Sequence, residues 1–338
     1  MATTNVLIVG AGAIGAFYAS RLAVVENVEV SVVCRSNYKA VKASGFHVLS
    51  PQYGDSTFRP THTFGSPQEA AKSGIKWDYA VVTTKALPDV SDDSKILEGL
   101  VSRDTAIVLI QNGLGVEDPY TKSFPDASVI TAVTIASAAQ TEPGVIKHNR
   151  WTRIEMGPYL PKGSSREAEA RATKQTQTFE SLLRQGGVKD AHAYDHADLQ
   201  LKRWHKIAIN ASMNPSSVLT GGASNNAMSL DPEMSQLLHG VMTEVLETAP
   251  KILGRQFPAK GYATPEAIIK STQKNTSGSV PSMQLDWESG KHMELEVILG
   301  NPIRLAREHG LSMPRMETLY ALVKMAQTTR EEKKQSKI

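Results

Sequence analysis

The chain has 338 residues, of which 41% are hydrophobic and 21% are charged, and its formal net charge is +3. This composition is typical of a globular protein long enough for two domains, and it shows no bias toward nucleic acid. The single cysteine, Cys34, excludes an internal disulfide and a cysteine-rich metal site, and no segment approaches the length of a membrane span. We therefore expect a cytoplasmic protein with no metal ion and no membrane contact; a homodimer is left open.

Residues 6–22 predict a strand, a tight turn and a helix. Four β-prone residues run from Val6 to Val9 into a GxGxxG turn, and helical spacing follows as far as Leu22. In such a motif the glycines allow the turn, the approach of a pyrophosphate and close helix packing, while the helix start attracts negative charge. This context predicts a dinucleotide site at Gly10, Gly12, Ala13, Ile14 and Gly15; the alternative is a glycine-rich joint that binds nothing.

The end of the next strand indicates which dinucleotide is bound. Residues 28–34 predict a second parallel strand, whose end would lie beside the adenosine ribose. An acidic residue at this point would favour NAD, but the sequence has Arg35-Ser36-Asn37 there. The guanidinium of arginine can donate several hydrogen bonds to a 2′-phosphate, so we predict that the cofactor is NADP(H). The alternative is that Arg35 is an ordinary surface arginine.

Further short β-rich runs at residues 78–84 and 105–110 each end in polar residues. Ligands of open α/β sheets lie beyond the carboxyl ends of the strands, which places Lys85 and Asn112 at the cofactor or substrate. Asn112-Gly113 is also a common turn pair, so a turn alone is the alternative. A strand from Val129, a hairpin at 144–157 and a helix at 164–185 complete the first domain, predicted as residues 1–195.

From His196 onward, β-branched runs fade and long helical patterns take over. The predicted fold class is α/β, with an N-terminal Rossmann-type doubly wound sheet followed by an all-α C-terminal domain at 196–330. Residues 254–279, rich in Gly, Thr, Ser and Lys, predict either a mobile insertion or a plain surface loop. Residues 331–338 predict a solvated, fraying tail. Its last tripeptide, Ser336-Lys337-Ile338, differs from a peroxisomal targeting signal in one side chain. A peroxisomal location is therefore the alternative to a cytoplasmic one.

Residues 196–214 predict one helix, and Pro215 limits its continuation. Lys206, Asn210 and Asn214 are four residues apart and share one stripe of that helix. Asparagine is a poor choice for two turns of an exposed face, so a lysine beside two amides suggests a proton donor with substrate-orienting partners. The alternative is a solvated face that ends in an Asn cap.

A second polar group follows Pro281. Ser282 is at a helix start, where its hydroxyl would cap the helix or bind a ligand. Glu294 stands among apolar residues, so its carboxylate is either half-exposed or paired with a lysine.

Together these motifs resemble the ketopantoate reductase family in order and spacing, over residues 6–326. The residues that carry the resemblance are the GxGxxG turn, Arg35, Thr84-Lys85-Ala86, Gln111-Asn112-Gly113, Glu142-Pro143-Gly144-Val145, Lys206, Asn210, Asn214-Pro215, Ser282-Met283 and Glu294. The lysine and asparagine helix, with the Ser and Glu twelve residues apart, is the most specific part.

The resemblance implies reduction of 2-dehydropantoate (ketopantoate) to pantoate by NADPH, in the biosynthesis of pantothenate. It implies Lys206 as general acid and Glu294 as its partner, with hydrogen bonds to the 2-oxo acid from Asn210, Asn214 and Ser282. It also implies that Lys85 and Asn112 lie near the nicotinamide and Arg35 on the 2′-phosphate.

Two departures leave the substrate open: the long 254–279 segment, and two tryptophans, Trp204 and Trp287, close in sequence to site positions. One alternative is therefore an NADPH-dependent reductase of a bulkier 2-oxo acid, carbonyl or imine. A more remote alternative is a non-catalytic NADP(H)-sensing protein.

Overall fold

The computed structural model describes residues 3–336, and residue contacts divide the chain into two compact units. The first comprises Met1–Lys85, Asp92–Gln111 and Val116–Leu199. The second comprises Gln200–Ile338 together with two short loops from the first half of the sequence, Ala86–Ser91 and Asn112–Gly115. Every strand within the described residues belongs to the first unit.

The first unit is a ten-stranded sheet in the order β4-β3-β9-β8-β7-β6-β1-β2-β5, with β10 pairing to β9. Neighbouring strands from β5 to β8 are all parallel and follow the Rossmann order, so the predicted doubly wound sheet is confirmed. Its central strands are buried on both faces, as parallel strands covered by helices require. The bounds are β1 Thr4–Val9, β2 Val28–Val33, β3 Phe46–Leu49, β4 Ser56–Phe58, β5 Thr63–Phe64, β6 Tyr79–Val82, β7 Ala106–Leu109, β8 Ser128–Glu142, β9 Val145–Tyr159 and β10 Ala191–Ala193.

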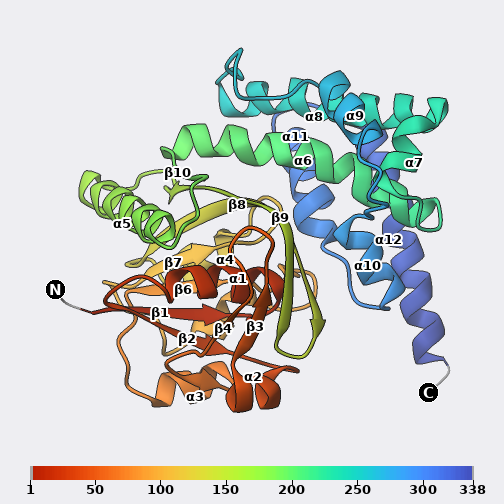
Figure 1. Ribbon diagram of the computed structural model, residues 1–338. Coiled ribbons are helices and arrows are strands. Elements are labelled where there is room, and N and C mark those ends of the chain that lie inside the picture. The colour runs from red at the N-terminus through yellow and green to blue at the C-terminus, as the bar shows by residue number, and fades with distance from the viewer. Residues whose placement is uncertain (1–2, 337–338) are drawn as a thin grey trace. The chain divides into compact units, whose positions relative to one another are not determined.

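The helices of this unit pack on the sheet and on each other. Helices α1 and α5 contact each other, and both pack against β8 and β9 (Figure 1). The bounds are α1 Ala13–Leu22, α2 Tyr38–Ser44, α3 Pro67–Lys72, α4 Asp118–Ser123 and α5 Arg166–Gln185, with a 3-10 helix at Asp93–Leu97.

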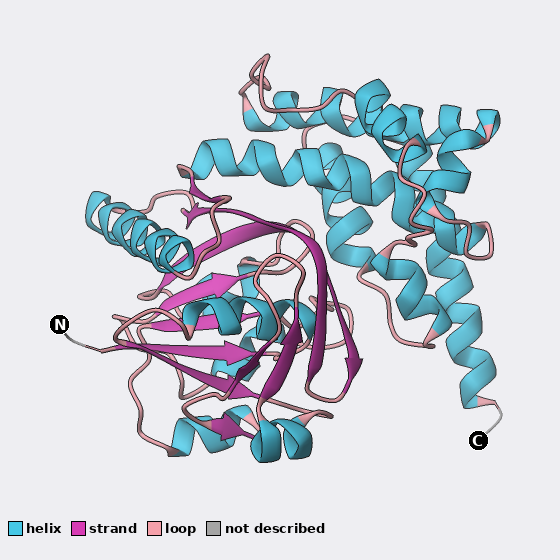
Figure 2. Cartoon of the chain, in the orientation of Figure 1, coloured by secondary structure: helices cyan, strands magenta, loops and turns pink. Residues whose placement is uncertain are grey.

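The hairpin expected at residues 144–157 is instead one strand, β9, which pairs antiparallel with the long strand β8; these are the two longest arrows in Figure 2. Each strand has 15 residues, and the chain turns between them at Gly144, whose φ is +84°. The first residues of β8 are buried and its last residues are exposed, so the hairpin extends beyond the covered part of the sheet.

All regular secondary structure in the described residues of the second unit is helical. Helix α8 packs against α7, α9, α11 and α12, and α12 also contacts a π-helix at Glu296–Gly300. The region 254–279 contains the ordered helix α9, which packs on α7 and α8. The bounds are α6 His196–Leu219, α7 Asn225–Leu230, α8 Pro232–Leu253, α9 Pro265–Gln273, α10 Ser282–Glu288, α11 Asn301–Glu308 and α12 Pro314–Gln335.

Two helix ends differ from the sequence-based expectation. Helix α6 continues one turn beyond Pro215, to Leu219, because the residues that follow the proline are buried and their packing outweighs one missing backbone hydrogen bond. Residues 331–335, expected to fray, are the last turns of α12, where Lys334 donates to the carbonyl of Gly290 at 2.7 Å. Lys337 and Ile338 of the possible targeting tripeptide lie outside the described residues.

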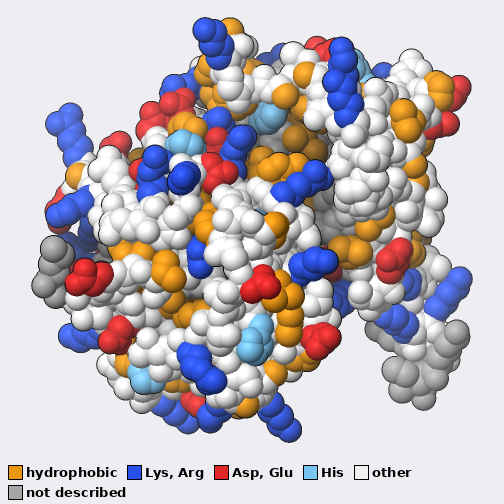
Figure 3. Space-filling view, viewed as in Figure 1, with side chains coloured by type: hydrophobic (Ala, Val, Ile, Leu, Met, Phe, Trp, Pro, Cys, Tyr) orange, Lys and Arg blue, Asp and Glu red, His pale blue; other side chains and the backbone are white. Residues whose placement is uncertain are grey.

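The surface in Figure 3 shows Lys and Arg side chains intermixed with Asp and Glu on the face that it presents. They do not gather there into one basic stripe of the kind that tracks a nucleic-acid backbone. Within residues 3–336, no helix combines the length and the apolar character needed to cross a membrane.

Candidate functional site: a glycine turn and a lysine–amide–carboxylate chain

The glycine turn follows β1 directly, and its first and third glycines are required by close neighbours. Gly10 has a φ of +99°, and a Cβ there would lie 2.8 Å from the backbone nitrogen of Thr84. A Cβ on Gly15 would overlap the hydroxyl of Thr83, which donates a hydrogen bond to the carbonyl of Gly10. A Cβ on Gly12, in contrast, would meet nothing within 4 Å. The turn is therefore tight on the protein side and open where a ligand would approach.

Helix α1 begins at this turn with free backbone donors. The first bond within the helix runs from the amide of Ala16 to the carbonyl of Gly12, so the three preceding amides have no helical acceptor. No side chain caps the helix, and its first turn carries no acidic residue. These amides, of Ala13, Ile14 and Gly15, fit the pyrophosphate of a dinucleotide.

The segment after β2 fits a phosphate on the adenosine ribose. Arg35 is exposed there, and its sequence neighbours from Cys34 to Lys42 include no acidic residue. The buried side chain of Asn37 donates a 2.8 Å hydrogen bond to the carbonyl of Ala11, which ties this segment to the glycine turn. Sequence reasoning missed this role of Asn37, because nothing in its spacing indicates a partner 26 residues away.

Within the second unit, three predicted side chains form a hydrogen-bonded chain. The ammonium of Lys206 donates to Oδ1 of Asn112 at 2.9 Å. The amide nitrogen of Asn112 donates in turn to Oε2 of Glu294 at 3.2 Å. Lys206 comes from α6, Asn112 from a loop after β7, and Glu294 from the segment before the π-helix. The structure therefore brings together residues that are 94 and 182 positions apart in sequence.

Burial is the main influence on the proton of Lys206. It lowers the pKa of Lys206 from 10.5 to about 8, and the negative charge of Glu294 opposes this shift. Near neutral pH the side chain is thus an ammonium that gives up its proton more readily than an exposed lysine.

The carboxylate of Glu294 is 6% exposed and accepts a second hydrogen bond, from the backbone amide of Ala86 at 3.2 Å. Each of its oxygens therefore faces an N–H donor. Sequence reasoning identified Glu294 but missed Ala86. Ala86 contributes a backbone amide, which every residue except proline has, so its residue type gives no indication of this role.

The other polar residues predicted for the substrate are unpaired within the described chain. The side chains of Asn210, Asn214 and Ser282 have no hydrogen-bond partner among residues 3–336. Asn214 is only 5% exposed, but its amide atoms are not among the fully buried polar atoms that lack a partner, so the amide keeps some access to solvent. Ser282 is exposed and is the first residue of α10; the cap position is Pro281, and no side chain caps this helix. Lys85 is exposed, three residues after the end of β6.

The two tryptophans that are close in sequence to site positions are not part of the hydrogen-bonded chain of Lys206, Asn112 and Glu294. Trp204 is 1% exposed. Trp287 is half-buried beneath the guanidinium of Arg330, which lies 4.2 Å from the ring centre. His205 points away from the chain of Lys206 and bonds to the carbonyl of Ala263 at 2.9 Å.

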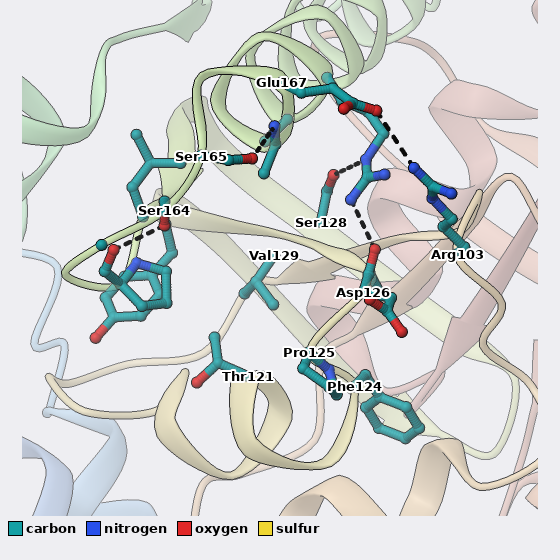
Figure 4. Close-up of a pocket in the computed structure, with 18 of the residues that line it drawn as sticks. Arg103, Thr121, Phe124, Pro125, Asp126, Ser128, Val129, Ser164, Ser165 and Glu167 are labelled. Carbon is teal, nitrogen blue, oxygen red and sulfur yellow. Dashed lines mark hydrogen bonds and ion pairs between the residues drawn. The ribbon is translucent and has the colours of Figure 1, made fainter.

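A cavity of about 700 Å³ lies in the first unit (Figure 4). Ser128 begins β8, so the cavity is at the amino ends of the strands, the edge opposite the glycine turn. Arg103 and Glu167 form an ion pair at its rim, and Arg171 is fixed by the carbonyl of Asp126. None of the predicted site residues lines it. The described residues also hold no cluster of three His, Cys, Asp or Glu side chains suited to a metal ion.

A parallel sheet with a glycine turn at the end of its first strand, followed by a helical unit, is the architecture of many nicotinamide-dependent oxidoreductases. The family model described as ketopantoate reductase PanE/ApbA matches residues 6–161, and its C-terminal model matches residues 198–327. The chain therefore belongs to the ketopantoate reductase family, as the motifs predicted.

Individual relatives agree in length and fold. The chain is 26% identical to a 2-dehydropantoate 2-reductase of Nostoc sp., over 94% of this chain and 93% of that protein. It is 33% identical to the crystal structure of 2-dehydropantoate 2-reductase from Methylococcus capsulatus, with a TM-score of 0.81 over 96% of this chain and 97% of the other. A D-mandelate dehydrogenase solved with NADH and anilino(oxo)acetate has a TM-score of 0.77, covers 97% of this chain and 99% of its own, and is 19% identical, which shows a shared fold alone.

Proposed function

We propose that this chain catalyses the NADPH-dependent reduction of 2-dehydropantoate to pantoate, with Lys206 as the general acid. The observation that supports it best is the hydrogen-bonded chain of Lys206, Asn112 and Glu294, in which burial lowers the pKa of the lysine to about 8. A reduced nicotinamide supplies the hydride for such a reaction.

The residues of the chain supply the proton and the orientation. As C2 of the substrate is reduced, its carbonyl oxygen gains negative charge, and Nζ of Lys206 donates a proton to that oxygen. Asn112 accepts from the ammonium and so limits the directions in which the proton can point. Glu294 keeps the lysine protonated to a higher pH than burial alone would allow.

Asn210, Asn214 and Ser282 would bind the polar groups of the 2-oxo acid. Their side chains carry donors with no partner in the described chain, and Asn210 and Asn214 occupy successive turns of α6 beyond Lys206. Donors of this kind orient a carboxylate and a carbonyl without forming a second acid.

For the cofactor, we propose that the turn residues Gly10, Gly12, Ala13, Ile14 and Gly15 bind the pyrophosphate. Arg35 would bind the 2′-phosphate, and Lys85 and Asn112 would approach the nicotinamide. The open side of Gly12 and the exposed guanidinium of Arg35 support these assignments.

The test is a panel of 2-oxo acids assayed with NADPH and with NADH, following the absorbance of the reduced nicotinamide. The panel includes an aryl 2-oxo acid, because the fold is shared with D-mandelate dehydrogenase and does not by itself select the substrate. We expect ketopantoate with NADPH to give the highest kcat/KM. A higher value for a bulkier acid would reassign the substrate within the same mechanism, whereas no oxidation with any member at saturating NADPH would reject the catalytic role.

A further inference from the structure

The π-helix at Glu296–Gly300 lies two residues after Glu294, and it changes which backbone groups are paired. The amide of Asn301 donates to the carbonyl of Glu296, five residues earlier, in place of the usual four. In this register the carbonyl of Val297 would be paired with the amide of residue 302. Residue 302 is a proline and has no N–H, so the carbonyl has no donor from its own helix.

That carbonyl accepts a hydrogen bond from outside the helix. The amide of Leu114 donates to the carbonyl of Val297 at 2.9 Å. Val297 is 1% exposed, so an unpaired carbonyl there would be costly. The missing donor of Pro302 therefore leaves Val297 free to hold a loop that is 183 positions away in sequence.

The same loop is held at two more points. The side-chain nitrogen of Asn301 donates to the carbonyl of Leu114 at 2.7 Å. Arg203, 4% exposed and three residues before Lys206, donates to the carbonyl of Gly113 at 3.1 Å. Gly113 has a φ of +97°, and a Cβ there would overlap Val297. Loop residues 113 and 114 are thus fixed by the two segments that also carry Lys206 and Glu294.

We propose that Pro302 and Asn301 are positioning residues that, through Val297 and Leu114, hold the side chain of Asn112 between Lys206 and Glu294. The inference deepens the function proposed above and rests on it for its catalytic consequence. Its structural content, that Pro302 keeps the Val297 carbonyl available to Leu114, can be tested without turnover.

The first test is Pro302→Ala, which supplies the missing N–H and lets the helix compete for the Val297 carbonyl. Amide hydrogen exchange of Leu114, read by NMR or by mass spectrometry of its peptide, should accelerate by about tenfold or more. The matched control is Pro250→Ala, which also replaces a buried proline in a helix of this unit, α8. Unchanged exchange at Leu114 in Pro302→Ala, or equal acceleration in the control, would overturn the proposal.

The second variant, Asn301→Asp, guards against a cavity effect at Pro302. Aspartate keeps the acceptor that Asn301 offers to Arg304, removes the donor to Leu114 and adds a negative charge. In both variants we expect kcat to fall by roughly tenfold to 100-fold, because a small misplacement of Asn112 disturbs the proton donor.

The pH profile distinguishes positioning from a loss of stability. Lys206 would lose the acceptor that favours its ammonium form, so the alkaline limb of kcat should move to lower pH in Pro302→Ala, which changes no charge, but not in Pro250→Ala. A fall in kcat with an unmoved limb would reject the positioning role. If the wild-type chain reduces no 2-oxo acid, the proposed function fails, and the exchange of Leu114 alone then decides the structural inference.

Discussion

Replacing Glu294 with glutamine tests the electrostatic role of the lysine–amide–carboxylate chain. Glu294 accepts from Ala86 with one oxygen and from Asn112 with the other. Glutamine offers one acceptor and one donor, so one of these contacts is lost. It also removes the negative charge that raises the pKa of Lys206. The pKa of Lys206 should therefore fall below about 8.

The size of the shift follows from the geometry. The hydrogen bonds on either side of Asn112 measure 2.9 and 3.2 Å, and the amide adds about 2 Å, so Nζ and the carboxylate are at most about 8 Å apart along this path. At an effective dielectric constant of about 20, two unit charges at that distance interact by about 2 kcal/mol. Lys206 is not fully buried, and the solvent that reaches it reduces this value. We expect a fall in pKa of roughly one unit, about a tenfold change in the protonation equilibrium.

The assay is the initial rate of NADPH oxidation with saturating 2-oxo acid, measured from about pH 6 to about pH 10. Reduction needs the ammonium form, so the alkaline limb of kcat should move to lower pH in Glu294→Gln. Glu244→Gln is the control, because it removes a carboxylate of the same unit that pairs with Arg315. An alkaline limb at the wild-type pH in Glu294→Gln would refute the coupling, as would an equal shift in the control.

Three further predictions concern the acid and the cofactor. Lys206→Met should lower kcat by about 100-fold or more while NADPH still binds, measured by fluorescence titration; normal turnover would remove Lys206 from the acid role. Arg35→Ala should weaken the binding of NADPH by roughly tenfold to 100-fold and leave the binding of NADH nearly unchanged. The control is Lys42→Ala, because the Lys42 ammonium bonds to Tyr38. An equal loss of affinity for both nucleotides would argue against the phosphate contact. The pKa of Lys206 is about 8 in the folded chain and 10.5 in an ordinary lysine, so the unfolded chain binds more protons between these two pH values. The free energy of unfolding, measured with urea, should therefore rise with pH over this range, and it should rise less steeply in Lys206→Met. Equal slopes in the two proteins would contradict the lowered pKa.

Sequence patterns predict the fold of the first unit well because the signals there are local in sequence. The glycines at 10, 12 and 15 act on backbone within a few residues, and apolar runs such as residues 79–82 correspond to strands buried on both faces. Helix limits are less predictable, since Pro215 ends a helix by local rules but lies inside α6, where packing decides.

The acid site is only partly predictable. Lys206 stands out by its spacing from Asn210 and Asn214 within one helix, and Glu294 by its apolar neighbours. The contacts of Ala86, Val297 and Leu114 use backbone atoms, which every residue type carries. Only the Asn301-Pro302 pair marks this part of the site in sequence, because a proline after an asparagine signals a changed backbone pattern.

The direction of the hydrogen bonds in the acid site explains why its middle residue is an amide. Asn112 must accept from an ammonium on one side and donate to a carboxylate on the other, and an amide does both without changing its protonation. A carboxylate in its place would hold the lysine proton more tightly, and a hydroxyl is too short to span both partners. An amide also has to be oriented, because a rotated Asn112 would turn its donors toward the ammonium. A loop held by backbone bonds to Val297 and by the side chains of Asn301 and Arg203 meets that requirement.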